Sequence, residues 1–285
     1  MSSVPLFITL VFAVSTLAGV LGSMLGLGGG VIVIPVLTLG LGIDIRYAIG
    51  ASIVSVIATS SGAAATYVKD HVTNIRVAML LEVATTVGAL CGVLGSAFIS
   101  TRWLYLLFAL ILLYSAYSMG KPSRQNRPHP SQGDKWADRL KLHSSYPDRA
   151  TGKEIDYLVT GVPLGFVLML GAGMISGLLG IGSGALKVPA MDGAMKLPIQ
   201  VSSATSNFMI GVTAAASAGA YYMHGDIIPL LAAPVALGVL FGSFFGPRFM
   251  MVLPARKIRQ LFILVLVFIA LEMGLKSFGV NVWSH

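Results

Sequence analysis

The stretch Met24–Pro35, MLGLGGGVIVIP, places four glycines within five residues of an otherwise apolar run. As a single helix, the apolar run Val4–Gly42 would be about 58 Å long at about 1.5 Å per residue, but the hydrocarbon core of a bilayer is only about 30 Å thick. The chain must therefore turn back inside this run, and glycine permits the turn because it adopts backbone angles that other residues avoid. The glycines of the turn are Gly26, Gly28, Gly29 and Gly30.

The segment after the turn, Val31–Leu41, is short for a full crossing of the bilayer. It therefore favours one of two arrangements. Either the break is the tip of a re-entrant hairpin, or two broken helices meet near the bilayer midplane. Backbone groups freed by such a break are tolerated inside a membrane only against protein or a water-filled cavity.

The composition places the whole chain in a membrane. Of its 285 residues, 55% are hydrophobic and 11% are charged, and the mean hydropathy is +0.84, whereas about a quarter of a soluble domain is charged. Apolar runs near the length of a bilayer-spanning helix recur, and strand-like alternation is absent, so we predict an all-α polytopic membrane protein with about 8–10 membrane segments. The runs are Val4–Leu25, Ala48–Val68, Val77–Ser100, Trp103–Met119, Tyr157–Leu179, Ser202–Met223, Ile227–Phe245 and Leu261–Leu275.

Several classes of protein are disfavoured by simple counts. The single cysteine, Cys91, excludes an intramolecular disulfide and a cysteine metal cluster. The first charged side chain is Asp44, so the first apolar run lacks the basic start of a secretory signal and is expected to be a retained helix. The net charge of +8 resides in loops between apolar runs, where it sets topology rather than binding nucleic acid.

The sequence also repeats internally. A shift of 154 residues places GLGGGVIVIP (Gly26–Pro35) on GIGSGALKVP (Gly180–Pro189). We therefore predict two transmembrane repeats, residues 1–120 and 157–285, joined by a linker over residues 121–156, and duplicated halves are typical of transporters. Without a gap, the same shift pairs Gly19 with Gly173, Ser52 with Ser206, Thr59 with Thr213, Tyr67 with Tyr221, Gly88 with Gly242, Gly92 with Gly246 and Arg102 with Arg256.

Equivalent loops of the two repeats carry opposite charge bias. The linker Lys121–Asp156 has eight Lys or Arg against five Asp or Glu, which predicts a cytoplasmic location. The loop Lys69–Arg76 has two cations and its counterpart His224–Asp226 has none, whereas Arg248–Arg259 has four and its counterpart has one. This pattern predicts inverted-topology repeats. Within the linker, Asp134–Leu142 forms either a short interfacial helix or an unstructured connection.

Each glycine break is a candidate site for an anion. A helix that restarts after the break presents backbone N–H groups and a partial positive charge. The alternative is that the glycines only permit tight helix packing, as small residues do in membranes. Two breaks in the same register of two halves favour the site. The second copy contributes Gly180, Gly182, Ser183 and Gly184.

Polar side chains near the breaks add to this candidate site. Lys187 follows the second break, and a lysine at the centre of a membrane helix costs about 2.5 to 3.5 kcal/mol, so it needs a partner or a wet cavity; the alternative is a lysine that snorkels to the interface. Neutral donors suit reversible binding of an anion, although they could equally form hydrogen bonds between helices. These donors are Ser52 and Thr59 in the first half and Ser206, Asn207 and Thr213 in the second, where the pairs seven residues apart share one helix face.

Glu82 lies inside the apolar run that begins near Arg76. A carboxylate there could couple the anion to protons, or it could lie at headgroup depth and pair with Arg76. The histidines do not cluster, so no metal site, cofactor or catalytic residue is predicted.

Three motifs carry a resemblance to a known family. GLGGGVIVIP, GIGSGALKVP and ATSNFMIGVT (Ala204–Thr213) resemble the TauE/SafE-type sulfite exporter family of bacterial membrane transporters. The resemblance covers nearly the whole chain except the linker. It implies passage of small sulfur-containing anions, such as sulfite or organosulfonates, across the cytoplasmic membrane. The second copy departs from the first at Ser183 and Lys187, which replace Gly29 and Val33.

We therefore expect an exporter of such anions, not an enzyme, that works by alternating access between its repeats in the bacterial inner membrane. Its partners are the anion and membrane lipids, no nucleic acid is expected, and a homo-oligomer is left open. A membrane factor for assembly or sensing that transports nothing is the first alternative. An intramembrane enzyme is the second, but no His or Asp accompanies the serines inside an apolar run.

Overall fold

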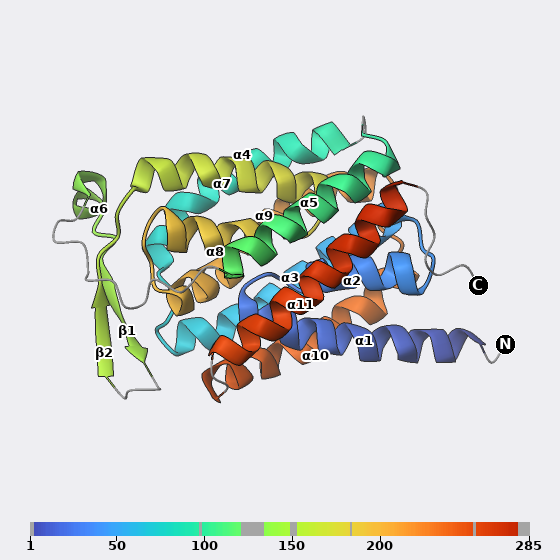
Figure 1. The fold of residues 1–285 in the computed structure, drawn as a ribbon, viewed down its shortest axis with the longest axis horizontal. Coiled ribbons are helices and arrows are strands. Elements are labelled where there is room, and N and C mark those ends of the chain that lie inside the picture. The colour runs from blue at the N-terminus through green and yellow to red at the C-terminus, as the bar shows by residue number, and fades with distance from the viewer. Residues whose placement is uncertain are drawn as a thin grey trace.

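The computed structural model describes residues 3–96, 99–120, 134–148, 153–182, 184–252 and 255–278. These form long helices that run side by side, with a small hairpin at one end (Figure 1). The elements are α1 (Ser3–Leu25), α2 (Gly30–Pro35), the π-helix η1 (Val36–Gly40), α3 (Ile45–Lys69), α4 (Ile75–Ser96), α5 (Thr101–Gly120), α6 (Lys135–Arg139), β1 (Ser144–Asp148), β2 (Lys153–Tyr157), α7 (Val162–Leu179), α8 (Gly184–Gly193), α9 (Ile199–Met223), α10 (Pro229–Val252) and α11 (Ala255–Ser277).

The prediction of a polytopic α-helical membrane protein is confirmed, whereas its count of about 8–10 membrane segments stays a prediction. Within the described residues, six helices are long and apolar enough to cross a bilayer. They also turn large apolar side chains outward, such as Leu94 (66% exposed) and Leu237 (60% exposed), as expected of a surface that contacts lipid. The six segments are Pro5–Met24, Ile45–Lys69, Ile75–Ser96, Thr101–Ser118, Val162–Leu179 and Pro229–Phe249.

The helix starts recur with the spacing of the sequence repeat. α2 begins at Gly30 and α8 at Gly184, which are 154 residues apart. The same difference separates the starts of α3 and α9, of α4 and α10, and of α5 and α11. Each half therefore has the same order of elements, in which a helix, a short helix and three longer helices follow one another.

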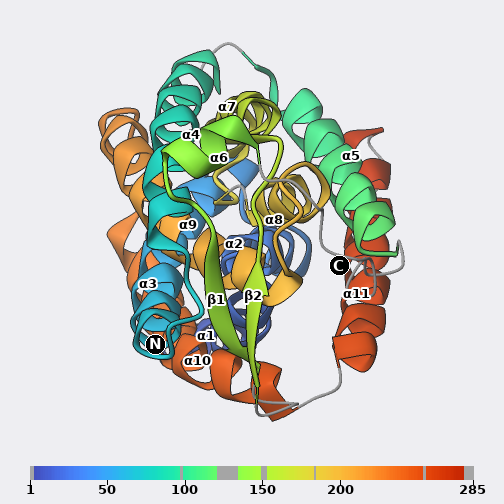
Figure 2. The ribbon, with the colours of Figure 1, turned by 90° about the vertical axis from the view of Figure 1, so that its left-hand side faces the viewer.

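The first helix of each half packs on a helix of the other half. α1 packs along α10, its equivalent α7 packs along α4, and α3 packs on α9. α5 and α11 pack on each other along one flank of the bundle (Figure 2). Glycines that match in the repeat lie at the α4–α7 and α1–α10 crossings. A Cβ on Gly88 would meet the backbone of Leu170, and one on Gly242 would meet the backbone of Thr16, so small residues allow both close approaches.

The linker has more structure than its sequence indicated. The helix considered for Asp134–Leu142 is present as α6, which Asp134 caps by accepting from the Trp136 N–H at 3.2 Å. The antiparallel hairpin β1–β2 was not expected, because its five-residue strands carry no clear alternation and one contains Pro147. Residues 121–133 and 149–152 of the linker lie outside the described residues.

Tertiary contacts hold the hairpin at one end of the bundle (Figure 2). Tyr146 and Tyr157 are buried against apolar residues of α4, α8 and α9. The Asn74 amide donates to the Tyr157 hydroxyl and to the Leu142 carbonyl, both at 2.9 Å. Burial raises the pKa of the Tyr157 hydroxyl, although its hydrogen bond with Asn74 opposes the shift. The loop before α4 therefore lies at the same end of the molecule as the linker.

Candidate functional site

The two glycine breaks have matching backbone geometry. Gly26 and Gly28 have φ of +70° and +72°, and the equivalent Gly180 and Gly182 have φ of +62° and +76°. These angles lie in the left-handed region, where glycine has little conformational strain and other residues have more. The left-handed residues end α1 and α7 and reverse the chain before α2 and α8, so the predicted turns are present in both halves.

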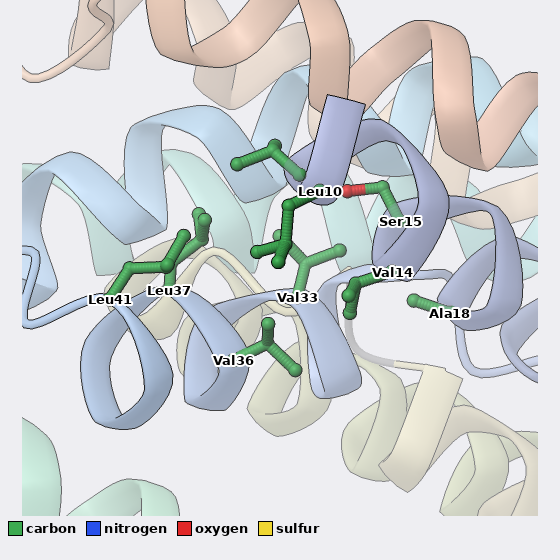
Figure 3. Close-up of a pocket in the computed structure, with 9 residues that line it drawn as sticks. Leu10, Val14, Ser15, Ala18, Val33, Val36, Leu37 and Leu41 are labelled. Atoms are coloured by element: carbon green, nitrogen blue, oxygen red, sulfur yellow. The ribbon is translucent and has the colours of Figure 1, made fainter. Parts of the chain in front are cut away.

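The chain folds back on itself after the first break. Residues of α2 and η1 lie against residues of α1 in antiparallel order, and their side chains line a small apolar cavity of about 10 Å³ (Figure 3). The helical segment Gly30–Gly40 is shorter than a bilayer-spanning helix, and so is α8 with its ten residues. The cavity itself is too small and too apolar to hold an anion. Its lining residues are Leu10, Val11, Val14, Ser15, Ala18, Val33, Val36, Leu37 and Leu41.

The two breaks are in direct contact with each other. A Cβ placed on Gly184 would meet the carbonyl oxygen of Gly26. A Cβ placed on Gly30 would lie 3.3 Å from the carbonyl oxygen of Gly180 and would collide with the Ser52 hydroxyl. The glycines of both copies are therefore needed for this close approach, and no side chain separates the breaks at these positions.

Equivalent serines tie each break to the long helix of the other half. The Ser52 hydroxyl on α3 donates to the Gly180 carbonyl at 2.8 Å. The Ser206 hydroxyl on α9 donates to the Gly26 carbonyl, also at 2.8 Å. Both serines are fully buried. In this conformation the two hydroxyls hold the breaks together, which is the interhelical role considered as the alternative to anion binding.

Two tyrosines form a second equivalent pair of bonds. The Tyr67 hydroxyl donates to the Ser23 carbonyl at 3.1 Å, and the Tyr221 hydroxyl donates to the Gly177 carbonyl at 2.6 Å. The accepting carbonyls belong to the last turns of α1 and α7. Neither tyrosine was predicted as a site residue, although their identity across the repeat could have indicated a shared role.

Asn207 also lies at the first break, and it is completely buried. Its side-chain amide donates to the Ser23 carbonyl at 3.0 Å and to the Ser203 carbonyl at 3.1 Å. Its Oδ1 has no hydrogen-bond partner. Its main-chain carbonyl accepts from the Ser60 hydroxyl at 2.5 Å. The first break is thus surrounded by polar groups of α9.

Lys187 lies in a buried charged cluster, which we define as Glu82, Thr86, Lys187 and Thr213. Its Nζ donates to the Thr213 hydroxyl at 2.7 Å and lies 3.5 Å from Oε2 of Glu82. The Thr213 hydroxyl donates in turn to Oε1 of Glu82 at 2.6 Å, and the Thr86 hydroxyl donates to the same oxygen at 3.1 Å. Lys187 is 0% exposed, so it does not snorkel to an interface. The partner that a membrane-buried lysine requires is Glu82.

Glu82 does not pair with Arg76, which was the alternative drawn from the sequence. Glu82 is the eighth residue of α4, about 10 Å along the helix axis from Ile75. Arg76 instead donates from its guanidinium to the main-chain carbonyl of Lys141 in the linker at 2.8 Å. Glu82 therefore pairs with a cation of the other half, because the packing of α4 on α9 and of α9 on α8 brings the two charges together.

The remaining candidate residues lie at or near the place where the two glycine breaks touch, which we call the break contact. Thr59 is buried and donates to the Ser55 carbonyl of its own helix, and a Cβ on Gly29 would lie 3.1 Å from its hydroxyl. Gly28 and Gly182 pack against Val56. Ser183 lies outside the described residues.

The break contact and the charged cluster are neighbours rather than one site. Ser206 and Thr213 are seven residues apart on α9, which separates the two groups by about 10 Å along the helix. Thr86 was missed by sequence reasoning, although its position four residues after Glu82 on a helix places it on the same face. Among the residues that the structure describes, no group of three or more His, Cys, Asp or Glu could hold a metal ion.

A larger cavity of about 350 Å³ lies away from both groups, at the start of α5 and the end of α11. Arg102 and Lys276 line it together with Tyr105 and Phe278. The Lys276 ammonium donates to the Thr38 carbonyl at 2.6 Å. This basic cavity does not include any of the predicted site residues.

Comparisons with known proteins agree with the fold and the motifs. The chain matches the family model described as "Sulfite exporter TauE/SafE" over residues 11–273. It is 24% identical over 267 residues to the probable membrane transporter protein YunE of Bacillus subtilis, covering 90% of this chain and 93% of YunE. It is 26% identical over 256 residues to the probable membrane transporter protein MJ0441 of Methanocaldococcus jannaschii, covering 85% of each chain.

A third relative matches only in part. The probable membrane transporter protein MamO of Paramagnetospirillum magneticum is 31% identical over 115 residues, which are 38% of this chain and 18% of MamO. No solved structure matches the chain.

Proposed function

Because the chain belongs to the sulfite exporter TauE/SafE family of membrane transporters, we propose that it transports a small sulfur-containing anion, such as sulfite or an organosulfonate, and exports it from the cell. One observation carries the choice of an anion. A fully buried lysine, Lys187, lies one turn after the second glycine break and is held by a hydroxyl and a carboxylate from other helices. Charge buried inside a membrane protein marks the path of a substrate or ion more often than a structural contact.

The proposed binding region lies between the glycine breaks and the charged cluster. The ammonium of Lys187 supplies the positive charge. The start of α8 contributes backbone N–H groups and a partial positive charge. When the breaks move apart, the hydroxyl and amide groups of Ser52, Ser206 and Asn207, and then that of Thr213 about 10 Å along α9, would exchange their present hydrogen bonds for the anion as it passes. Neutral donors of this kind hold an anion without trapping it.

Alternating access follows if the repeats are inverted in the membrane. We propose that they are, with the linker and the loop before α4 on the cytoplasmic side of the inner membrane. Two observations support this arrangement. Asn74, in the loop before α4, contacts the basic linker directly. The equivalent loop of the second half, His224–Asp226, lies instead against the first turns of α3, where a Cβ on Gly50 would meet the Asp226 carbonyl. Rocking of one repeat against the other would separate the breaks and expose Lys187 to each side in turn.

A flux assay tests the function. The purified protein in proteoliposomes should exchange labelled sulfite, thiosulfate or methanesulfonate for the same unlabelled anion. Lys187→Ala should lower this exchange at least tenfold, whereas Lys196→Ala, an exposed lysine in the loop after α8, should leave it unchanged. Unchanged exchange in folded Lys187→Ala would remove Lys187 from the site. No exchange of any of these anions by the wild type would contradict the proposed function itself.

A further inference from the structure

The charged cluster is electrically balanced before any substrate enters. Lys187 contributes one positive charge and Glu82 one negative charge, with side-chain exposures of 0% and 13%. The elements packed on α4 bring few other charges. α7 has no charged side chain, and the titratable groups of α9 are Tyr221 and Tyr222 near its end. α8 adds Asp192, more than one turn beyond Lys187, and α4 itself carries Arg76, which is bound to the linker, and Cys91.

The hydrogen bonds within the cluster are unequal at the two carboxylate oxygens. Oε1 of Glu82 accepts from both threonine hydroxyls, Thr213 and Thr86. Oε2 accepts no hydrogen bond, although it is buried and lies 3.5 Å from the Lys187 ammonium. Oε2 is therefore the oxygen that can take a proton without breaking an existing hydrogen bond.

A substrate anion cannot simply add to this cluster. If it joined Lys187 while Glu82 stayed ionised, the buried site would carry a net negative charge, and uncompensated charge in a low-dielectric interior is strongly unfavourable. Glu82 therefore occupies, as an internal carboxylate, the place that the anion must take. The balance is restored if one proton binds Glu82 for each single negative charge that enters.

We propose that Glu82 competes with the substrate for Lys187, and that a proton on Glu82 travels with each singly charged anion. This inference rests on the proposed function. The proton comes from the side that faces the open site and binds Oε2, the anion then pairs with Lys187, and both leave together on the other side. One negative and one positive charge cross in the same direction, so the cycle moves no net charge, and export requires the outward concentration gradient of the anion to exceed the inward gradient of the proton. Return of the empty protein requires Glu82 ionised and paired with Lys187 again.

Proton-driven accumulation tests the coupling. Methanesulfonate is a suitable probe because it stays singly charged over the working pH range. Wild-type proteoliposomes that are more alkaline inside by about one pH unit should accumulate it up to about tenfold, since one coupled proton transfers the whole gradient. Glu82→Gln should lose this accumulation driven by the pH gradient, because its amide cannot carry the proton, whatever rate of exchange it retains. Glu154→Gln, in the hairpin, should behave as wild type.

The membrane potential provides a second readout, which already tests the coupling in the wild type. A potassium diffusion potential should not change methanesulfonate uptake by the wild type, and it should change uptake by Glu82→Gln. If exchange is present but a pH gradient drives no accumulation, or if the potential drives wild-type uptake, the coupling is wrong while the transport function stands. If the wild type shows no exchange of any tested anion, the proposed transport function is wrong, and the coupling that rests on it is wrong as well.

Discussion

Lys187 and Glu82 form an ion pair in which the lysine side chain is 0% exposed and the glutamate side chain 13% exposed. Removing one member of a buried ion pair leaves the other as an uncompensated charge, which is far worse than removing both. The lysine could be predicted from sequence as unusual, because it interrupts an apolar segment. Its partner could not, because Arg76 is close to Glu82 along the chain and only the packing of α4, α8 and α9 shows that Lys187 is closer in space.

A double-mutant cycle tests this dependence. Lys187→Met and Glu82→Gln should each lower the free energy of unfolding by about 3–5 kcal/mol, because each leaves one buried charge unpaired. The double variant should recover most of that loss, which gives a coupling of about 2 kcal/mol or more. The measurement is thermal or denaturant unfolding of the detergent-solubilised protein. Additive losses would mean that the two charges do not interact in solution.

Each glycine break works as one structural element, in which several residues together turn the chain and hold it. Each break reverses the chain with two left-handed glycines, and each is held by a serine of the opposite half, Ser52 or Ser206. The sequence predicted the turns and the short helices that follow, because glycine spacing and helix length are local properties. It could not decide between anion binding and helix contact for the serines, because their bonds join residues far apart in the chain.

Two glycines of α8 give a matched test of the break contact. Gly184→Ala would push a methyl group into the backbone at Gly26, so we expect a loss of about 1–3 kcal/mol in unfolding free energy and reduced anion exchange. Gly193→Ala, at the exposed end of the same helix, meets no atom within 4 Å and should change stability by less than about 1 kcal/mol. Equal effects of the two substitutions would show that the breaks are not in close contact.

At the scale of the whole molecule, the main contacts between a helix of one half and a helix of the other have equivalents with the halves interchanged. α1 packs on α10 as α7 packs on α4, and the central α3 and α9 pack on each other. This exchange of partners explains why glycines recur in register, since each close helix crossing occurs twice. The small linker subdomain, α6 with β1–β2, has no equivalent among the described residues and lies at one end of the bundle (Figure 2).

Cysteine labelling tests the proposed orientation of the halves. The native Cys91 is exposed and is first replaced by Ser. Single cysteines are then placed at Lys135 in α6 and at His224 after α9, both of which are exposed. In intact cells, a membrane-impermeant maleimide should label His224→Cys and leave Lys135→Cys unlabelled until the membrane is permeabilised. The opposite pattern would contradict a cytoplasmic linker.

The sequence by itself determined the membrane-spanning helices, the duplication and the turns, because hydropathy, repeat register and glycine angles are properties of neighbouring residues. Only the tertiary structure decided which groups meet. In it, Glu82 pairs with Lys187, and Ser52 and Ser206 each bind the glycine break of the opposite half. Tertiary contacts also stabilise a hairpin whose strands are too short to be recognised from the sequence alone. The reason is physical: inside a membrane a polar group must find a partner within the protein, and that partner is set by helix packing.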